Sequence, residues 1–134
     1  MKKIIVFLLL ALLLISCASP SSTPNPAAGT RPAITDPFTP IEVQAGDTFN
    51  IVIDANPSTG YHWEFVGELD GSVVEFVSRD YTADEPVLTG SGGVDVWTFK
   101  AVSAGQTQIT LGSYPPGVDD GEPEQNVTFN IIVK

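Results

Sequence analysis

The chain offers one thiol and one imidazole for nucleophilic or acid–base chemistry, and their places in the sequence argue against an enzyme. Cys17 and His62 are the only cysteine and the only histidine. Nucleophilic catalysis needs a base within hydrogen-bond reach of the nucleophile. Cys17 ends a targeting segment described below, and no serine lies in a nucleophile-elbow sequence that would pair with His62. His62 alternates with Tyr61 and Trp63, so we expect it on the polar face of a strand. We predict that the protein is not an enzyme.

Metal and modification signals are weak. No cluster of histidine and cysteine suits a transition metal. Asp119, Asp120 and Glu122 surround Gly121 and could offer oxygens to calcium, but their spacing does not match the twelve-residue calcium loop. A solvated acidic turn is the better interpretation. The triplet 126–128 fits the N-glycosylation pattern but lies inside a strand-like run, and we interpret it as a chance match. We predict no metal and no cofactor.

A more specific signal lies between two strand-like runs, 49–54 and 61–67. Six residues with distinct conformational roles follow one another there: Asn56, Pro57, Ser58, Thr59, Gly60 and Tyr61. Pro57 fixes one φ angle and biases Asn56 toward an extended shape, and Gly60 permits a positive φ. Ser58 and Thr59 remain at the tip, small and polar. Such a stiff polar loop suits insertion into a groove of another protein, although on its own it also fits an ordinary turn.

The N-terminus predicts export. After two lysines, residues 4–15 form an unbroken apolar run of 12 residues. As a helix this run would span ~18 Å, less than the ~30 Å hydrocarbon core of a bilayer, so residues 1–17 are typical of a signal peptide. Its last four residues, 14–17, resemble the bacterial lipobox, in which the cysteine is lipidated. We expect an exported, membrane-anchored lipoprotein acylated on Cys17, at the cell surface or the periplasmic face, and at the outer membrane in a Gram-negative host. A plain secretory signal is the alternative.

The segment that follows predicts a tether. Residues 18–37 are rich in proline, serine, threonine and alanine and show no hydrophobic periodicity. Such composition favours disordered or extended chain. We therefore place the boundary of the folded domain at Phe38, with one domain over residues 38–134.

The domain shows a repeated strand pattern. Seven runs alternate apolar and polar residues or are rich in β-branched and aromatic residues: 41–45, 49–53, 61–65, 73–81, 94–102, 107–111 and 127–133. Seven short strands in about 100 residues predict an all-β fold, an immunoglobulin-like β-sandwich. The side chains expected to face inward are Ile41, Val43, Phe49, Ile51, Ile53, Trp63, Phe65, Trp97, Phe99, Ile109, Leu111, Phe129 and Ile131.

The charge of this domain excludes one class of partner. Residues 38–134 contain three basic and fifteen acidic residues, which gives a net charge of −12. Nucleic-acid binding needs a basic patch, so we expect no nucleic-acid partner.

Three loops follow the second, fourth and sixth predicted strands, at residues 56–61, 88–93 and 113–124. In a sandwich of this strand order these connections fall at one end. We therefore expect a rigid sandwich that presents three adjacent loops.

Here the sequence resembles the chagasin-type inhibitors of papain-like cysteine proteases. The first motif of that family, Asn-Pro-Thr-Thr-Gly-Tyr/Phe, is matched by residues 56–61, with Trp63 following at the usual place. The second, Gly-x-Gly-Gly, is matched by four consecutive residues: Gly90, Ser91, Gly92 and Gly93. Residues 97–101 and 104–105 are similar to the fifth strand of the family and its turn. The resemblance covers essentially all of residues 38–134.

The third motif departs from the family. Its usual Arg-Pro-Trp/Phe corresponds here to the region of Tyr114, Pro115, Pro116 and Gly117. Pro116 matches the proline of the motif, but the arginine is replaced by Pro115 and the aromatic residue by Gly117. Buried aromatic anchors are frequent hot spots of protein interfaces. The departure predicts weaker binding, a changed target, or a module without inhibitory activity.

The resemblance implies reversible inhibition by occlusion, with no chemistry. The first loop would enter the cleft of a papain-like cysteine protease with Ser58 and Thr59 at its centre, and the other two loops would grip its sides. The implied partners are that protease and, through Cys17, a membrane, and we expect a monomer. The alternative is a surface-anchored binding or adhesion module that kept the sandwich and lost inhibition.

Overall fold

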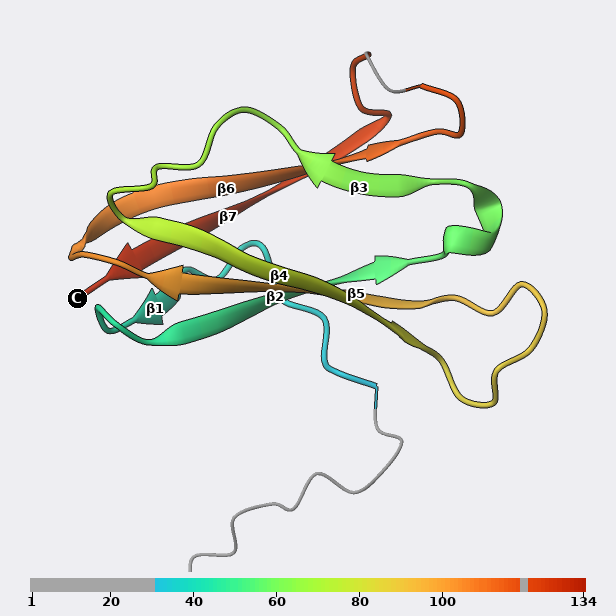
Figure 1. Ribbon diagram of the computed structural model, residues 1–134, viewed down its shortest axis with the longest axis horizontal. Helices are drawn as coiled ribbons and strands as arrows, with labels where there is room; N and C mark the ends of the chain where they lie inside the picture. Colours follow the sequence, from blue (N-terminus) through green and yellow to red (C-terminus); the bar gives the residue numbers. More distant parts are fainter. Residues whose placement is uncertain (1–30, 119–120) are drawn as a thin grey trace, which may run out of the picture.

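The computed structural model describes residues 31–118 and 121–134, and these form two β-sheets packed face to face (Figure 1). Cys17, the predicted signal peptide, residues 18–30 of the predicted tether, Asp119 and Asp120 lie outside the described residues. Over the described ranges, no helix has the length and apolar character needed to cross a membrane.

Over residues 31–118 and 121–134 the fold consists of seven strands and one short 3-10 turn. Their bounds are β1 (Ile41–Val43), β2 (Thr48–Ala55), η1 (Pro57–Thr59), β3 (His62–Phe65), β4 (Val74–Ala83), β5 (Gly93–Ala101), β6 (Gly105–Tyr114) and β7 (Gln125–Val133). One sheet has the order β1-β7-β6-β3 and the other β2-β5-β4. The pairing of β1 with β7 is parallel, and the other pairs are antiparallel. The prediction of an all-β immunoglobulin-like sandwich is confirmed.

The core lies between the two sheets. All thirteen side chains predicted to face inward are either buried or packed against the buried cluster. Aromatic rings meet across the two sheets, with Phe65 of one sheet contacting Phe76, Trp97 and Phe99 of the other at centroid distances of 5.0–6.1 Å. Val73 and Val74, which the alternation did not place in the core, are also buried there.

β4 contains a β-bulge. The pairing register with β5 shifts between Phe76 and Ser78, so that Val77 is an extra residue. After the bulge the inward side passes from even to odd numbers, because one added residue reverses the alternation of a strand. Phe76 and Arg79 consequently both meet the ring of Trp97.

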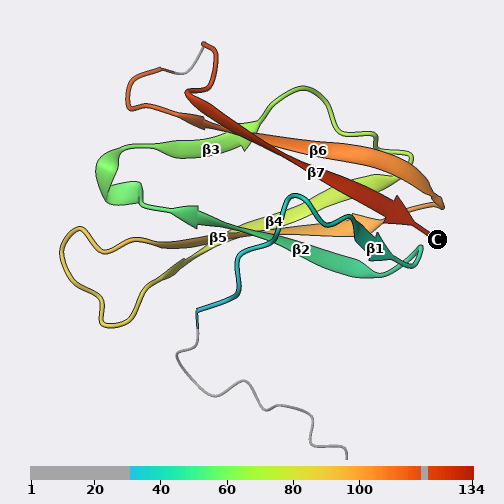
Figure 2. The same cartoon turned by 180° about the vertical axis from the view of Figure 1, so that it is seen from behind.

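Residues 31–37, predicted from composition to be the end of the tether, lie against the sandwich. The backbone N–H of Thr35 donates to the carbonyl of Val52 at 2.9 Å, and the N–H of Val52 donates to Thr35 Oγ1 at 2.9 Å. β2 is an edge strand, so its outer backbone groups need partners. The chain then crosses to the other sheet and becomes β1 (Figure 2). The described chain therefore already contacts the domain before the boundary placed at Phe38, through Thr35 and Arg31.

Candidate functional site

Three loops lie together at one end of the sandwich, at the right in Figure 1. The first loop (56–61) joins β2 to β3, the second loop (84–92) joins β4 to β5, and the third loop (115–124) joins β6 to β7. The strand order therefore places the three connections as the sequence predicted.

The first loop is held in shape by its own hydrogen bonds. Pro57–Thr59 form a 3-10 turn capped by Asn56, whose Oδ1 accepts from the backbone N–H of Ser58 at 3.2 Å and from its hydroxyl at 2.6 Å. Thr59 Oγ1 donates to the carbonyl of Asn56 at 2.7 Å. Gly60 ends the turn with φ +83°, in the left-handed region that glycine allows. The tip is thus a rigid turn with exposed Ser58 and Thr59, and the positive φ expected at Gly60 is confirmed.

The second loop is tied to the first at its side. Asn56 Nδ2 donates to the carbonyl of Gly90 at 3.3 Å. Gly90 has φ +83°, which explains a glycine at this position. Gly93 begins β5 and is buried, and a Cβ there would overlap the carbonyl oxygen of Thr82. The Gly-x-Gly-Gly run therefore combines a turn that is hydrogen-bonded to the first loop with a packing glycine at its end.

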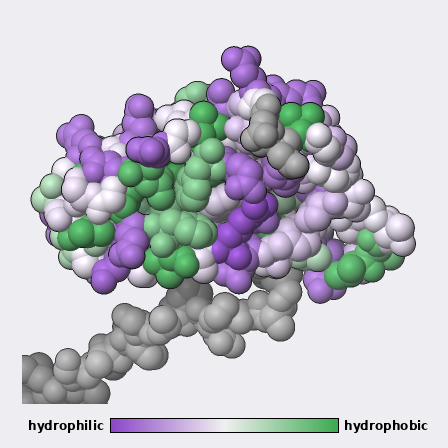
Figure 3. Space-filling view, turned by 45° about the horizontal axis from the view of Figure 1, so that its top comes forward, coloured by the Kyte–Doolittle hydropathy of each residue, from purple (hydrophilic) through white to green (hydrophobic). Residues whose placement is uncertain are grey.

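The second loop also carries two apolar side chains that the motif does not include. Val87 and Leu88 are 65% and 66% exposed. Figure 3 shows apolar atoms projecting at the lower right of the molecule, next to pale atoms of intermediate hydropathy. In the sequence, Val87 and Leu88 are two adjacent aliphatic residues outside the seven strand-like runs and beside a glycine-rich motif, and this signal could have identified them as candidate binding residues.

The third loop packs on the opposite side of the first. A Cβ on Gly60 would lie 2.8 Å from the Cβ of Pro116. Tyr61 Oη donates to Glu124 Oε2 at 2.7 Å. This hydrogen bond, and then the negative charge of Glu124, raise the pKa of Tyr61 above its ordinary value.

His62 and Tyr114 face each other where β3 pairs with β6. Their rings stack with centroids 5.8 Å apart and an interplanar angle of 24°. His62 is consequently half-buried, whereas the sequence predicted an exposed surface residue. Tyr114 belongs to β6 and is also half-buried, which leaves Pro116 and Gly117 as the exposed residues of the expected third motif.

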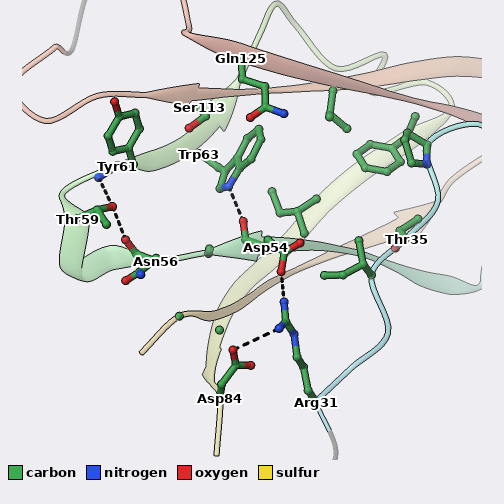
Figure 4. A pocket seen from close by; sticks show the side chains of 18 residues that line it. Arg31, Thr35, Asp54, Asn56, Thr59, Tyr61, Trp63, Asp84, Ser113 and Gln125 are labelled. Atoms are coloured by element: carbon green, nitrogen blue, oxygen red, sulfur yellow. Dashed lines mark hydrogen bonds and ion pairs between the residues drawn. The ribbon is translucent and has the colours of Figure 1, made fainter. Parts of the chain in front are cut away.

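Beneath the first loop, an open hollow of about 550 Å³ separates the edges of the two sheets (Figure 4). Its walls come from β2, β3, β7 and residues 31–37. Trp63 spans the gap, and its indole N–H donates to the carbonyl of Asp54 at 2.9 Å. The hollow is therefore closed on one side by a contact between the strands that flank the first loop.

A partly buried ion pair links three strands of the sandwich. Asp95, only 3% exposed, accepts from Arg79 at 2.5 Å. The same guanidinium donates to the carbonyl of Trp63 at 2.9 Å and lies 4.7 Å from the ring centre of Trp97. One side chain thus joins β4, β5 and β3. Asp95 was missed from the sequence, although its odd-numbered place in β5 with Trp97 and Phe99 indicates an inward direction.

Comparison with known proteins identifies the family. A sequence model described as chagasin family peptidase inhibitor I42 matches residues 42–133. The chain belongs to the chagasin family. Because this is a family of peptidase inhibitors, the prediction that the protein is not an enzyme is confirmed.

Individual known proteins are also similar in sequence and structure. Amoebiasin-2 of Entamoeba histolytica is 27% identical over 97 residues, covering 70% of this chain and 76% of that protein. The crystal structure of the cysteine protease inhibitor EhICP2 from Entamoeba histolytica superposes with a TM-score of 0.58 and 25% identity, covering 70% of this chain and 85% of the other. Leishmania mexicana ICP gives a TM-score of 0.53 and 28% identity, covering 75% of this chain and 91% of the other.

The chagasin family model matches the chain only from residue 42 onward. The match starts within β1 and so includes all three loops but not residues 31–37. The contacts of residues 31–37 therefore belong to a part of this chain that precedes the family match.

Proposed function

We propose that this protein is a reversible inhibitor of papain-like cysteine proteases and that its three loops form a wedge that fills the active-site cleft. The observation that carries the proposal is the first loop, whose exposed tip at Ser58 and Thr59 is supported by the second loop through Gly90 and by the third through Pro116. The description of EhICP2 as a cysteine protease inhibitor supports the target class.

The shape of the first loop suits a ligand that binds without being cleaved. Its backbone is a 3-10 turn, and the Ser58 and Thr59 hydroxyls are already bonded to Asn56. Nucleophilic attack requires the scissile carbonyl to be held in a near-attack geometry, and a closed turn does not present an extended peptide bond to the thiolate. Because the loop is ordered before binding, less conformational entropy is lost on association.

The second loop supplies apolar contact area that the third loop lacks. Tyr114 is engaged with His62, and the aromatic position of the expected third motif is Gly117. Val87 and Leu88 are exposed and lie on the opposite flank of the first loop. Apolar anchors that fill a pocket often carry much of the binding energy of an interface. We therefore assign the main apolar contact with the protease to the second loop.

Titration against a panel of papain-like proteases tests this function. We expect reversible inhibition of papain or a cathepsin that is competitive with substrate. Lack of inhibition across the panel at protein concentrations of about 100 μM, a range of weak affinity, would contradict it. Capture of cell-wall carbohydrate without inhibition would instead favour the adhesion module, the alternative suggested by the altered third loop.

We also propose that lipid on Cys17 anchors the protein to a membrane as a monomer. The support is the lipobox-like sequence of residues 14–17 after a short apolar run. Stable anchoring needs more than one acyl chain, which diacylation of a lipobox cysteine supplies. The wild-type chain should incorporate labelled palmitate and be found in the membrane fraction. Cys17→Ser should do neither. Equal membrane association of the two would refute the anchor, and light scattering of the purified protein checks the monomer.

A further inference from the structure

We propose that Arg31 is a positioning residue that holds the first and second loops in the arrangement that the protease recognises. The inference rests on the proposed function for its inhibitory consequence. It concerns a residue that lies before the part of the chain matched by the family model.

Arg31 joins carboxylates from two separate strand ends (Figure 4). Its guanidinium is 3.2 Å from Asp84 Oδ2 and forms an ion pair with Asp54 Oδ1. Asp54 is two residues before Asn56, and Asp84 is the first residue of the second loop. A guanidinium is planar and carries five donors, so it can engage two carboxylates at once in a fixed geometry.

Each of these aspartates also makes a backbone hydrogen bond at the point where its loop leaves the sheet. The carbonyl of Asp54 accepts from the Trp63 indole at 2.9 Å, and the N–H of Asp84 donates to the carbonyl of Gly92 at 3.0 Å. Movement of either aspartate therefore moves the loop beside it. The direct link from Asn56 to Gly90, at 3.3 Å, is longer than a typical N–H···O bond. Without the cation, the two carboxylates would be left with mutual repulsion.

The segment that carries Arg31 is itself fixed to the fold. Thr35 exchanges two hydrogen bonds with Val52, both at 2.9 Å. Ile34 and Pro37 line the hollow beneath the first loop. The pairing with β2 therefore places the guanidinium between Asp54 and Asp84, where the first and second loops begin.

The test compares Arg31→Ala with Lys134→Ala in the full chain. Lys134 forms an ion pair with Glu42 at β1, at the C-terminal end of β7 and away from the three loops, with a side chain about half exposed. The side chains in these ion pairs are all at least one-third exposed, so the pairs should contribute little to stability. Arg31→Ala also leaves Asp84 without its cation while Asp84 Oδ1 is buried without a hydrogen-bond partner among the described residues, so its melting temperature should fall slightly more than that of Lys134→Ala. Arg31→Ala should raise Ki for papain about fivefold to tenfold, the range of modest coupling between sites. Lys134→Ala should leave Ki unchanged.

A second measurement does not depend on any protease. Backbone amide order parameters from NMR relaxation should fall at residues 56–61 and 84–92 in Arg31→Ala and stay constant in Lys134→Ala. Arg31→Lys should be intermediate, because an ammonium is a point charge without the planar fork.

The outcomes separate the two proposals. Inhibition by the wild-type chain with equal Ki and equal loop order in both alanine variants would overturn the role of Arg31 and leave the inhibitory function standing. If the wild-type chain inhibits no protease, the proposed function fails. The order parameters then still decide whether Arg31 positions the loops.

Discussion

Gly60 and Pro116 lie in such close contact that a Cβ on Gly60 would be 2.8 Å from the Cβ of Pro116. The two residues belong to the first and third loops, which are separated by more than fifty positions in the sequence. Gly60 also has φ +83°. The glycine of the first motif therefore has two independent reasons to lack a side chain, one in its own backbone and one in its neighbour.

Replacing Gly60 by alanine should reduce both stability and inhibition. A left-handed backbone costs an ordinary residue about 1–2 kcal/mol, and the added methyl must also displace Pro116. Gly46→Ala is the matched control, because Gly46 has φ +96° and no atom within 4 Å of the Cβ position. Urea unfolding should show a loss in both variants, whereas protease titration should show a higher Ki for Gly60→Ala alone. Equal Ki values would mean that contact between the first and third loops is irrelevant to binding.

The tip of the first loop should not tolerate bulk. We expect the double variant Ser58→Arg with Thr59→Arg to abolish inhibition, because two long charged side chains would occupy the narrowest part of the wedge. The melting temperature should fall only modestly, since both residues are exposed and the variant removes two surface hydrogen bonds to Asn56. Ser103→Arg with Gln106→Arg, at exposed positions near the opposite end, controls for the added charge. A tip variant that inhibits as well as this control would refute insertion of the first loop.

Leu88→Asp should weaken inhibition by about thirtyfold, the equivalent of losing a hot-spot contact of about 2 kcal/mol. The physical reason is that a side chain 66% exposed in the free protein would be desolvated in a protease subsite. Val77→Asp is the control, because Val77 is 54% exposed at the bulge of β4. Similar Ki values for the two variants would remove the second loop from the interface.

Arg79 should matter more for stability than its partner Asp95. Truncation of Arg79 leaves a carboxylate with a 4% exposed side chain without its ion pair, which typically costs about 3–5 kcal/mol. Truncation of Asp95 leaves a guanidinium that is 31% exposed and can reach water, so a loss of about 1–2 kcal/mol is expected. Urea unfolding of Arg79→Ala and Asp95→Ala measures both values. A larger loss of stability in Asp95→Ala than in Arg79→Ala would contradict this account of the ion pair.

Tyr61 should titrate at a higher pH than an ordinary tyrosine, because its hydroxyl donates to Glu124, whose charge also opposes ionisation. Since the folded pKa is raised, the stabilising contribution is complete below the usual tyrosine pKa of about 10. It is lost as pH rises through the raised value. Glu124→Gln should move the tyrosinate absorbance of Tyr61 to lower pH, whereas Glu122→Gln should not. Identical titration curves for the two variants would contradict this coupling.

The sequence by itself determined the strands, the inward side chains and the order of the three loops. These follow from local properties: alternation places Ile51, Trp97 and Phe129 on the inner faces, and glycine and proline fix the shape of the first loop. The seven predicted runs all became strands, with bounds that differ by a few residues.

The tertiary structure decided the contacts between segments that are distant in the sequence. Arg31 meets Asp84, Gly60 meets Pro116 and His62 stacks on Tyr114 only because strand pairing brings them together. The bulge at Val77 and the pairing of residues 31–37 with β2 were hidden for the same reason. A local pattern records what each segment prefers, whereas an extra residue in a strand or an unpaired sheet edge has an effect only when its neighbour is in place.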